Sequence, residues 1–242
     1  MKKSAFFLTA LCSGSLLVAS CSNDKAADST ATTTETTVTD TAAAGGMAGM
    51  DHSAMGHDGA TAAGSSPQLV AMNEMMTKMH AITPKGNTDH DFAHHMLAHH
   101  QGAVVMADIE LRDGKDATMR RMAEKIKADQ QKEIAELEAA ATRLDNAPTN
   151  YKPNDPSDPF TSKMKASMDG MMQNMPKPVA DPDMNFNMLM TVHHQSAVDM
   201  ARAELAHGKD TKLKEMAQMM VDAQQLEIQQ FKDWHTNNTD KM

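Results

Sequence analysis

The sequence contains little of several residue types on which whole classes of protein depend. Only two cysteines occur in 242 residues, Cys12 and Cys21, so a disulfide framework or a cysteine-based zinc site is not available. Aromatic residues make up 3%, which argues against a β-sandwich or barrel. Lysine and arginine number 23 against 32 acidic residues, and the net charge of -9 argues against nucleic acid as the main partner.

Familiar catalytic motifs are also missing. The sequence has no nucleophile elbow, phosphate loop, dinucleotide fingerprint or HExxH pair. Methionine is abundant instead, with 25 residues, and 12 histidines accompany it. All methionines except Met1 lie at or after Met47. This composition points to thioether and imidazole chemistry without thiolates.

The N-terminus has the pattern of a secretory signal. Lys2 and Lys3 precede a mostly apolar stretch that is too short to span a membrane, and small residues follow it. The run Val-Ala-Ser-Cys that ends at Cys21 is typical of a bacterial lipoprotein cleavage box. We therefore predict a lipoprotein signal peptide over 1–20 and lipidation of Cys21, which would place the protein in the cell envelope, lipid-anchored and facing the periplasm or the outer surface. The alternative is an ordinary signal peptide with an incidental cysteine.

Residues 21–66 are rich in Thr, Ala, Gly and Ser and have almost no large apolar side chain except methionine. Such a segment cannot bury enough surface to offset its ordering entropy, so we predict a disordered tether. Soft-metal ligands gather in eleven of its residues, and the candidates are Met47, Met50, His52, Met55 and His57. The alternative is a low-complexity tract of biased composition.

The remainder of the chain is an internal duplication with an offset of 94 residues. The motif HHQ-x-AV-x-MA-x-x-E begins at His99 and again at His193, and a Gln-Gln-x-Glu-Ile segment follows in both copies. We predict helical repeats over 67–147 and 160–238, joined by a proline-rich linker over 148–159.

Each repeat predicts a short Met-rich helix, a long helix, a tight turn and a second long helix. Gly114 and Gly208 stand where a helix ends, and Asp116 and Asp210 are positioned to cap the next helix. Two helical hairpins make a four-helix bundle, so the predicted fold class is all-α and ferritin-like. The Met-rich segments have two interpretations, apolar caps on the bundle or further soft-metal sites.

At helical spacing, the two histidine pairs lie on the face expected to be the core. The candidate metal ligands on this face are Met96, His99, His100, Met106, Met190, His193, His194 and Met200. Carboxylates and amides near them are candidate supporting or additional ligands, namely Glu110, Gln130, Glu133, Glu204, Gln224 and Glu227. Folding the first hairpin about its glycine pairs His99 or His100 with Gln130, and Met96 with Glu133.

These residues also have ordinary structural explanations. Methionines at helical spacing commonly fill a core, and histidines on an apolar face are commonly hydrogen-bonded there. Gln130 and Gln224 are expected to form hydrogen bonds rather than to ligate. The recurrence of four histidines at equivalent positions, beside Met and Glu, favours metal ligation by some of them.

Copper fits this set of ligands best. Thioethers are soft and favour Cu(I), whereas imidazole serves both Cu(I) and Cu(II). Zinc is a weaker candidate. A di-iron bundle needs two Glu-x-x-His motifs, and only one is present, from Glu204 to His207; the first copy has Asp113 where the second has His207.

The duplicated pattern F-x-x-x-M-x-x-HHQ-x-AV-x-MA-x-x-E resembles domain-of-unknown-function family 305 over roughly residues 68–235. That family is ferritin-like and helical, and it includes periplasmic copper-binding proteins of the CopM type. The resemblance implies a four-helix bundle and copper binding. Carried over by position, it supports Met96, His99, His100, Met106, Met190, His193, His194 and Met200.

The sequence therefore predicts an extracytoplasmic protein that binds copper, with Cu(I) favoured, for buffering, sequestration or delivery. Its expected partners are copper ions, the membrane through a lipid anchor only, and a copper-export or copper-oxidase protein, with no nucleic acid. Two alternatives stay open, a ferritin-like metal-dependent oxidase and a metal-free helical interaction module. An enzyme is the less favoured of these interpretations.

Overall fold

The structure is a computed structural model that describes residues 65–242. Its helices are α1 (Pro67–Ala81), α2 (Thr88–Asp113), α3 (Ala117–Leu144), α4 (Pro159–Gln173), α5 (Pro182–His207) and α6 (Thr211–Thr236), and a 3-10 turn (Thr239–Lys241) follows. No strand occurs in this range, so the all-α prediction is confirmed. The predicted signal peptide, with Cys21, and the tether up to residue 64 lie outside the described residues.

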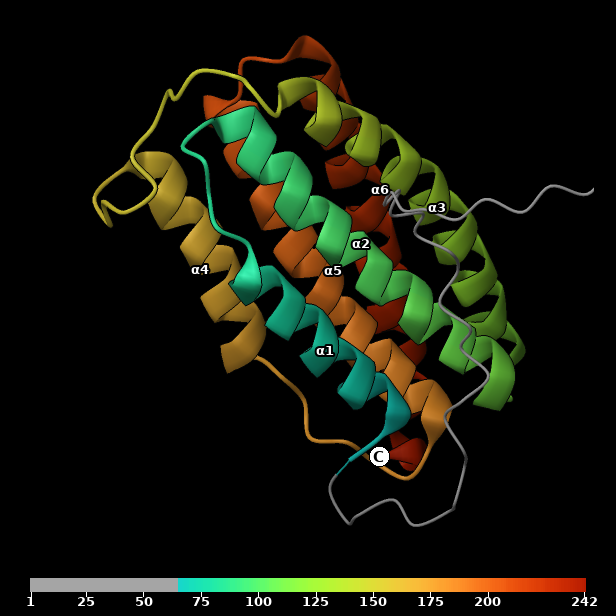
Figure 1. Ribbon diagram of the computed structural model, residues 1–242. Helices are drawn as coiled ribbons and strands as arrows, with labels where there is room; N and C mark the ends of the chain where they lie inside the picture. The colour runs from blue at the N-terminus through green and yellow to red at the C-terminus, as the bar shows by residue number, and fades with distance from the viewer. Residues whose placement is uncertain (1–64) are drawn as a thin grey trace, which may run out of the picture. The chain divides into compact units, whose positions relative to one another are not determined.

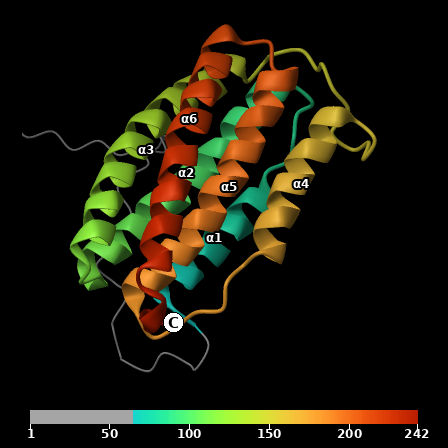
Figure 2. The ribbon, with the colours of Figure 1, turned by 180° about the vertical axis from the view of Figure 1, so that it is seen from behind.

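Two helical hairpins build the bundle, as predicted. Helix α2 packs against α3, α5 packs against α6, and the hairpins meet where α2 contacts α5. Figures 1 and 2, taken from opposite sides, show α2 and α5 in the middle, with α3 and α6 on one side and α1 and α4 on the other. Each short helix covers the long helix that follows it, α1 on α2 and α4 on α5.

This middle position buries α2 and α5 almost all round. Of their 26 residues each, 17 are buried in α2 and 16 in α5. The sequence predicted a single apolar stripe, but side chains outside it, such as His90 and Ala98, are buried as well. The reason is that a second layer, formed by α1 and α4, covers the side that faces away from α3 and α6.

Helix α1 joins the core through its methionines. Met72, Met75, Met76 and Met79 are all buried. Helix α1 approaches α2 closely at Gly102, where an added Cβ would lie 2.5 Å from the Cγ of Met75. The methionines of α1 therefore pack as apolar side chains of the bundle. In α4 the pattern is weaker, because Met172 is 46% exposed.

The turns within the two hairpins follow the predicted capping. The Asp116 side chain accepts hydrogen bonds from the backbone at the start of α3, and Asp210 does so at the start of α6. The glycines that end α2 and α5 differ from the usual left-handed helix end. Gly114 has φ -69° and Gly208 has φ -60°, both with extended ψ.

Two aspartates that the sequence analysis did not single out tie the repeats together reciprocally. Asp89, in the first repeat, accepts hydrogen bonds at 2.7 and 2.6 Å from the backbone N–H groups of Lys209 and Asp210. Asp183, at the equivalent position of the second repeat, accepts bonds at 2.9 and 2.8 Å from Lys115 and Asp116. Each hairpin turn is therefore held by the other repeat.

We expect Asp89→Ala to lower the free energy of unfolding by about 1–3 kcal/mol, because it leaves two backbone donors without their acceptor. Urea unfolding followed by circular dichroism measures the change. Asp222→Ala is the matched control, since that carboxylate is exposed and accepts only from Gln218 on its own helix. Equal stability of the two variants would contradict the assignment.

Candidate metal centre

The centre of the bundle is the contact between two histidines of different repeats. His99 on α2 and His193 on α5 are both fully buried, and their ring centroids lie 3.6 Å apart. The Nε2 of His193 lies 2.9 Å from the backbone oxygen of His99. Because a carbonyl oxygen only accepts, Nε2 of His193 carries the proton and its Nδ1 keeps a lone pair.

These inner imidazoles have nitrogen atoms that no other described residue satisfies. Within residues 65–242, Nδ1 of His193 and both ring nitrogens of His99 are buried without a hydrogen-bond partner. Burial lowers the pKa of both rings well below the ordinary value, and neighbouring imidazoles lower it further. Both rings are therefore neutral at neutral pH, which is the state that binds a metal.

The outer histidines of the two pairs each have a carboxylate partner. Nε2 of His100 lies 2.8 Å from Glu133, and Nε2 of His194 lies 2.9 Å from Glu227. The expected pairing placed Gln130 opposite the histidines, whereas these contacts are with the glutamates three residues further along the partner helices. Nδ1 of both outer rings is again buried without a partner among the described residues. A carboxylate on one nitrogen fixes the tautomer and presents the other nitrogen's lone pair, as in many metal sites.

The two carboxylates are not equivalent. Lys125 of the first repeat donates to Glu227 over 2.8 Å, and the side chain of Glu227 is 9% exposed. Burial alone would raise the pKa of Glu227, but His194 and Lys125 outweigh it and lower the pKa. Glu133 is 25% exposed, and the position equivalent to Lys125 is Met219, whose side chain is exposed. The first His–Glu pair therefore lies nearer to solvent than the second.

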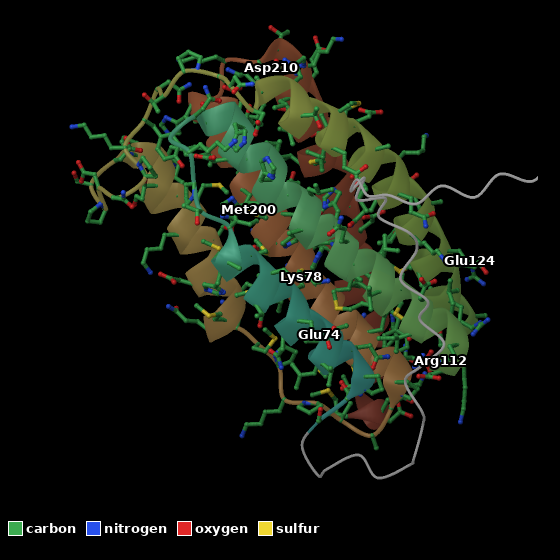
Figure 3. All side chains as sticks on the ribbon, viewed as in Figure 1. Glu74, Lys78, Arg112, Glu124, Met200 and Asp210 are labelled. Atoms are coloured by element: carbon green, nitrogen blue, oxygen red, sulfur yellow. The ribbon has the colours of Figure 1, made fainter. Side chains whose placement is uncertain are left out.

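The predicted sulfur ligands are in the same interior. All four have no exposed surface, and they are Met96, Met106, Met190 and Met200. Met96 and Met190 lie one helical turn before their histidine pairs, on the same helix face. Figure 3 labels Met200 on α5 within the bundle, and Asp210 at the end where α6 begins.

The remaining candidates separate into two groups. Gln130 and Gln224 are buried one turn before the two glutamates, and their Oε1 atoms have no hydrogen-bond partner in residues 65–242. Glu110 and Glu204 lie beneath the glycines that end their own helices, Gly114 and Gly208.

Glu110 and Glu204 are held as neutral acids. Burial raises the pKa of Glu110 to about 9, and the neighbouring Asp183 adds to the increase. Burial likewise raises the pKa of Glu204 to about 9, with Asp89 acting in the same direction. These are the two aspartates that hold the hairpin turns. The sequence signal that marks this arrangement is a spacing that both repeats share, with Asp at the start of the long helix and Glu-x-x-x-Gly at its end.

Several predicted features are not assembled into a site by the described residues. The cluster Met47, Met50, His52, Met55 and His57 lies outside them. Within residues 65–242, no group of three or more His, Cys, Asp or Glu is arranged to hold a metal ion. The single Glu-x-x-His motif is not part of a three-ligand group in these residues, and the ring of His207 packs against Phe160. None of the helices in this range is long and apolar enough to cross a membrane.

The fold and the site together define a duplicated helical bundle with paired buried histidines at its centre. The family model described as "Domain of unknown function (DUF305)" matches residues 21–141 and again 89–235, and the two matches end at equivalent positions of the repeats. The chain belongs to the DUF305 family, which confirms the family predicted from the HHQ motif.

Solved structures with similar folds include CopM and a further family member. The Cu(I)-bound form of CopM is 25% identical, with a TM-score of 0.47, over 62% of this chain and 96% of that one. The Ag-bound form of CopM is also 25% identical, with a TM-score of 0.48 and the same coverage. A DUF305 fragment from Deinococcus radiodurans is 26% identical, with a TM-score of 0.47, over 64% of this chain and 99% of that one. No curated protein matches the chain.

Proposed function

We propose that this protein is an extracytoplasmic copper-binding protein that holds Cu(I) through imidazole and thioether groups and buffers, sequesters or delivers it. The observation that carries the proposal is the set of buried imidazoles at the bundle centre whose Nδ1 atoms no other described residue satisfies. An unsatisfied buried acceptor costs about 1–3 kcal/mol, and a bound metal ion would remove that cost.

The valence follows from charge and ligand type. The carboxylates nearest the histidines, Glu133 and Glu227, already accept from Nε2 of His100 and His194. A dry interior with few free anions favours a monovalent ion over a divalent one, because the desolvation cost rises with charge. Four buried thioethers on the same helices add soft ligands, which favour Cu(I).

The further parts of the proposal concern the N-terminal region. The Met/His cluster at 47–57 would capture Cu(I) and exchange it with the bundle. Lipidation at Cys21 would hold the protein in the cell envelope, close to a copper-export or copper-oxidase protein. The composition of these segments supports both steps.

An anaerobic Cu(I) titration against a competing chelator tests the proposal on the full chain. The bundle variant is His99→Phe with His193→Phe, which keeps two stacked rings and removes their nitrogens. Apolar replacement of unsatisfied groups can be neutral or stabilising, so this variant is expected to fold. We expect it to lose the tightly held Cu(I), whereas His235→Ala, at a histidine outside the two pairs, retains it.

A second variant with alanine at Met47, Met50, His52, Met55 and His57 assigns the remaining binding. Cu(I) should also raise the melting temperature of the wild-type chain, because the ligand binds the folded state. A folded bundle variant that retains all Cu(I) while the tract variant loses it would move the function to the tract. Failure of every variant, wild type included, to compete would overturn the copper proposal.

A further inference from the structure

A second histidine cluster lies at the start of α2, away from the central pairs. His90 is buried, with its side chain 4% exposed, and its Nδ1 lies 2.7 Å from Oδ1 of Asp91. The carboxylate of Asp91 also accepts from the backbone N–H groups of Lys85 and Gly86 and from the hydroxyl of Tyr151.

The hydrogen bond with Asp91 orients the His90 ring. A carboxylate only accepts, so Nδ1 of His90 carries the proton and Nε2 keeps the lone pair when the ring is neutral. Nε2 is buried without a hydrogen-bond partner in residues 65–242. It lies 3.8 Å from Oδ1 of Asp145, on the turn that follows α3. A cation bound between these two atoms would satisfy both acceptors.

A second imidazole and an ammonium group lie close to these two atoms. The ring of His94, one helical turn further along α2, lies 4.3 Å from the ring of His90 between centroids and is half-buried. The ammonium group of Lys85 pairs with Asp145. Cations are therefore already favoured beside this carboxylate.

Comparison with the second repeat shows which residues of this segment the fold itself requires. Asn185 stands at the position equivalent to Asp91, and it holds the preceding loop through two hydrogen bonds of 2.8 Å with Val179. The loop contact is therefore formed in both repeats. The positions equivalent to His90 and His94 are Met184 and Met188, so the fold of this segment does not require histidines there.

We propose that Nε2 of His90, the ring of His94 and the carboxylate of Asp145 bind a divalent cation of borderline softness, such as Zn²⁺ or Cu²⁺. Two imidazoles and a carboxylate, with a water completing the set, are typical ligands for such ions. Ligands at about 2.0–2.2 Å from one ion lie roughly 3.3–4.2 Å from each other, a range that includes the 3.8 Å between Nε2 and Oδ1. Asp91 is a positioning residue that orients His90.

Binding requires a local rearrangement. In the described residues no three such ligands are gathered around one point, and Lys85 pairs with Asp145. The ion takes the place of this ammonium group, and the His94 ring turns toward Nε2 of His90. The site uses nitrogen and oxygen rather than sulfur, so it is independent of the proposed Cu(I) function.

Titration of the full chain with Zn²⁺, followed by calorimetry, tests the site through three variants. We expect His94→Ala to weaken one Zn²⁺ equivalent by about tenfold or more, and Lys85→Met to tighten the same equivalent by about tenfold. His235→Ala is the matched control. His235 lies against Asn187, in the first turns of α5, whereas Asp89, next to His90, binds the turn after the C-terminus of α5. His235 is therefore at the opposite end of the bundle from the proposed site, and its substitution should leave Zn²⁺ binding unchanged.

A local measurement separates this site from the central histidines and from the tract. Paramagnetic Co²⁺ added to ¹⁵N-labelled chain should broaden the amide signals around residues 85–94 and 145–151, and less so in His94→Ala. No broadening there in either the wild type or Lys85→Met, or a Zn²⁺ titration unchanged in both variants, would overturn the proposal. Loss of Cu(I) binding alone would leave it standing.

Discussion

Replacing Glu110 and Glu204 together by glutamine is expected to remove most of the stability loss that this protein undergoes as the pH rises from about 6.5 to about 9. Both side chains are fully buried, and their pKa values are raised from 4.5 to about 9. In this pH range the folded protein holds protons that the unfolded chain releases. Stability therefore falls with increasing pH, by up to about 1.4 kcal/mol per pH unit for each group.

Other carboxylates act in the opposite direction at lower pH. The pKa of Asp91 and that of Glu227 are lowered in the folded protein, so their contribution is lost as the pH falls through the acid range. The buried rings of His99 and His193, whose pKa values lie well below 6.5, also make the folded protein less stable below pH 6.5, so we expect maximum stability near pH 6.5. Glutamine keeps a donor toward Asp183 and Asp89 without an ionisable proton, so the double variant should be more stable than the wild type at pH 8.

Urea unfolding at a series of pH values measures both effects. Glu215→Gln is the matched control, because this side chain is exposed and its substitution should leave the pH profile unchanged. A wild-type stability that rises between pH 6.5 and pH 9, or a double variant with the wild-type slope, would contradict neutral carboxyl groups at these positions.

Alanine at Gly114 or Gly208 is expected to lower the free energy of unfolding by about 1–3 kcal/mol at each position. The backbone conformation is one that alanine adopts easily, so the cost is steric. A Cβ at Gly114 would lie 2.5 Å from Cδ of Glu110 and 2.6 Å from its backbone oxygen, and one at Gly208 would lie 2.7 Å from the backbone oxygen of Glu204. Because backbone atoms are involved, movement of the glutamate side chain alone does not relieve the contact.

Gly170→Ala separates this contact from the general effect of replacing glycine. Gly170 lies in α4, and a Cβ there would have no neighbour within 4 Å. Alanine at this helical position is expected to stabilise the protein by up to about 1 kcal/mol. In thermal unfolding, Gly114→Ala and Gly208→Ala should therefore have lower midpoints than the wild type, and Gly170→Ala a higher one. Equal midpoints for Gly114→Ala and Gly170→Ala would show that the Glu–Gly packing is unimportant.

Sequence periodicity could not provide the side-chain partner of His100 in the first hairpin. The spacing of residues placed His100 on the core face of α2 and identified Glu133 as an unusual carboxylate on the facing helix. It placed Gln130 opposite the histidines, whereas Nε2 of His100 contacts Glu133, three residues further along α3. At the turn of this hairpin, Asp183 of the other repeat accepts two backbone hydrogen bonds, a contact that spacing within one repeat does not reveal.

The contact between His99 and His193 also depends on how the two repeats pack. The duplication placed His99 and His193 at equivalent positions, but whether they form one site or two depends on how the repeats cross. The structure brings the two rings together between α2 and α5. The cluster of His90 and Asp145 is likewise formed by residues from α2 and from the turn after α3, and a pattern within one helix gives no sign of it.

The sequence by itself determined the all-helical class, the duplication, the capping aspartates of the hairpins and the supply of imidazole and thioether groups in place of thiols. These features depend on local periodicity, on capping chemistry and on composition, all of which are contained in neighbouring residues. The tertiary structure alone decided the two-sided burial of α2 and α5, the reciprocal aspartates and the partner of each histidine. Those features depend on contacts between residues far apart in the chain, which form only when both hairpins and their covering helices pack together.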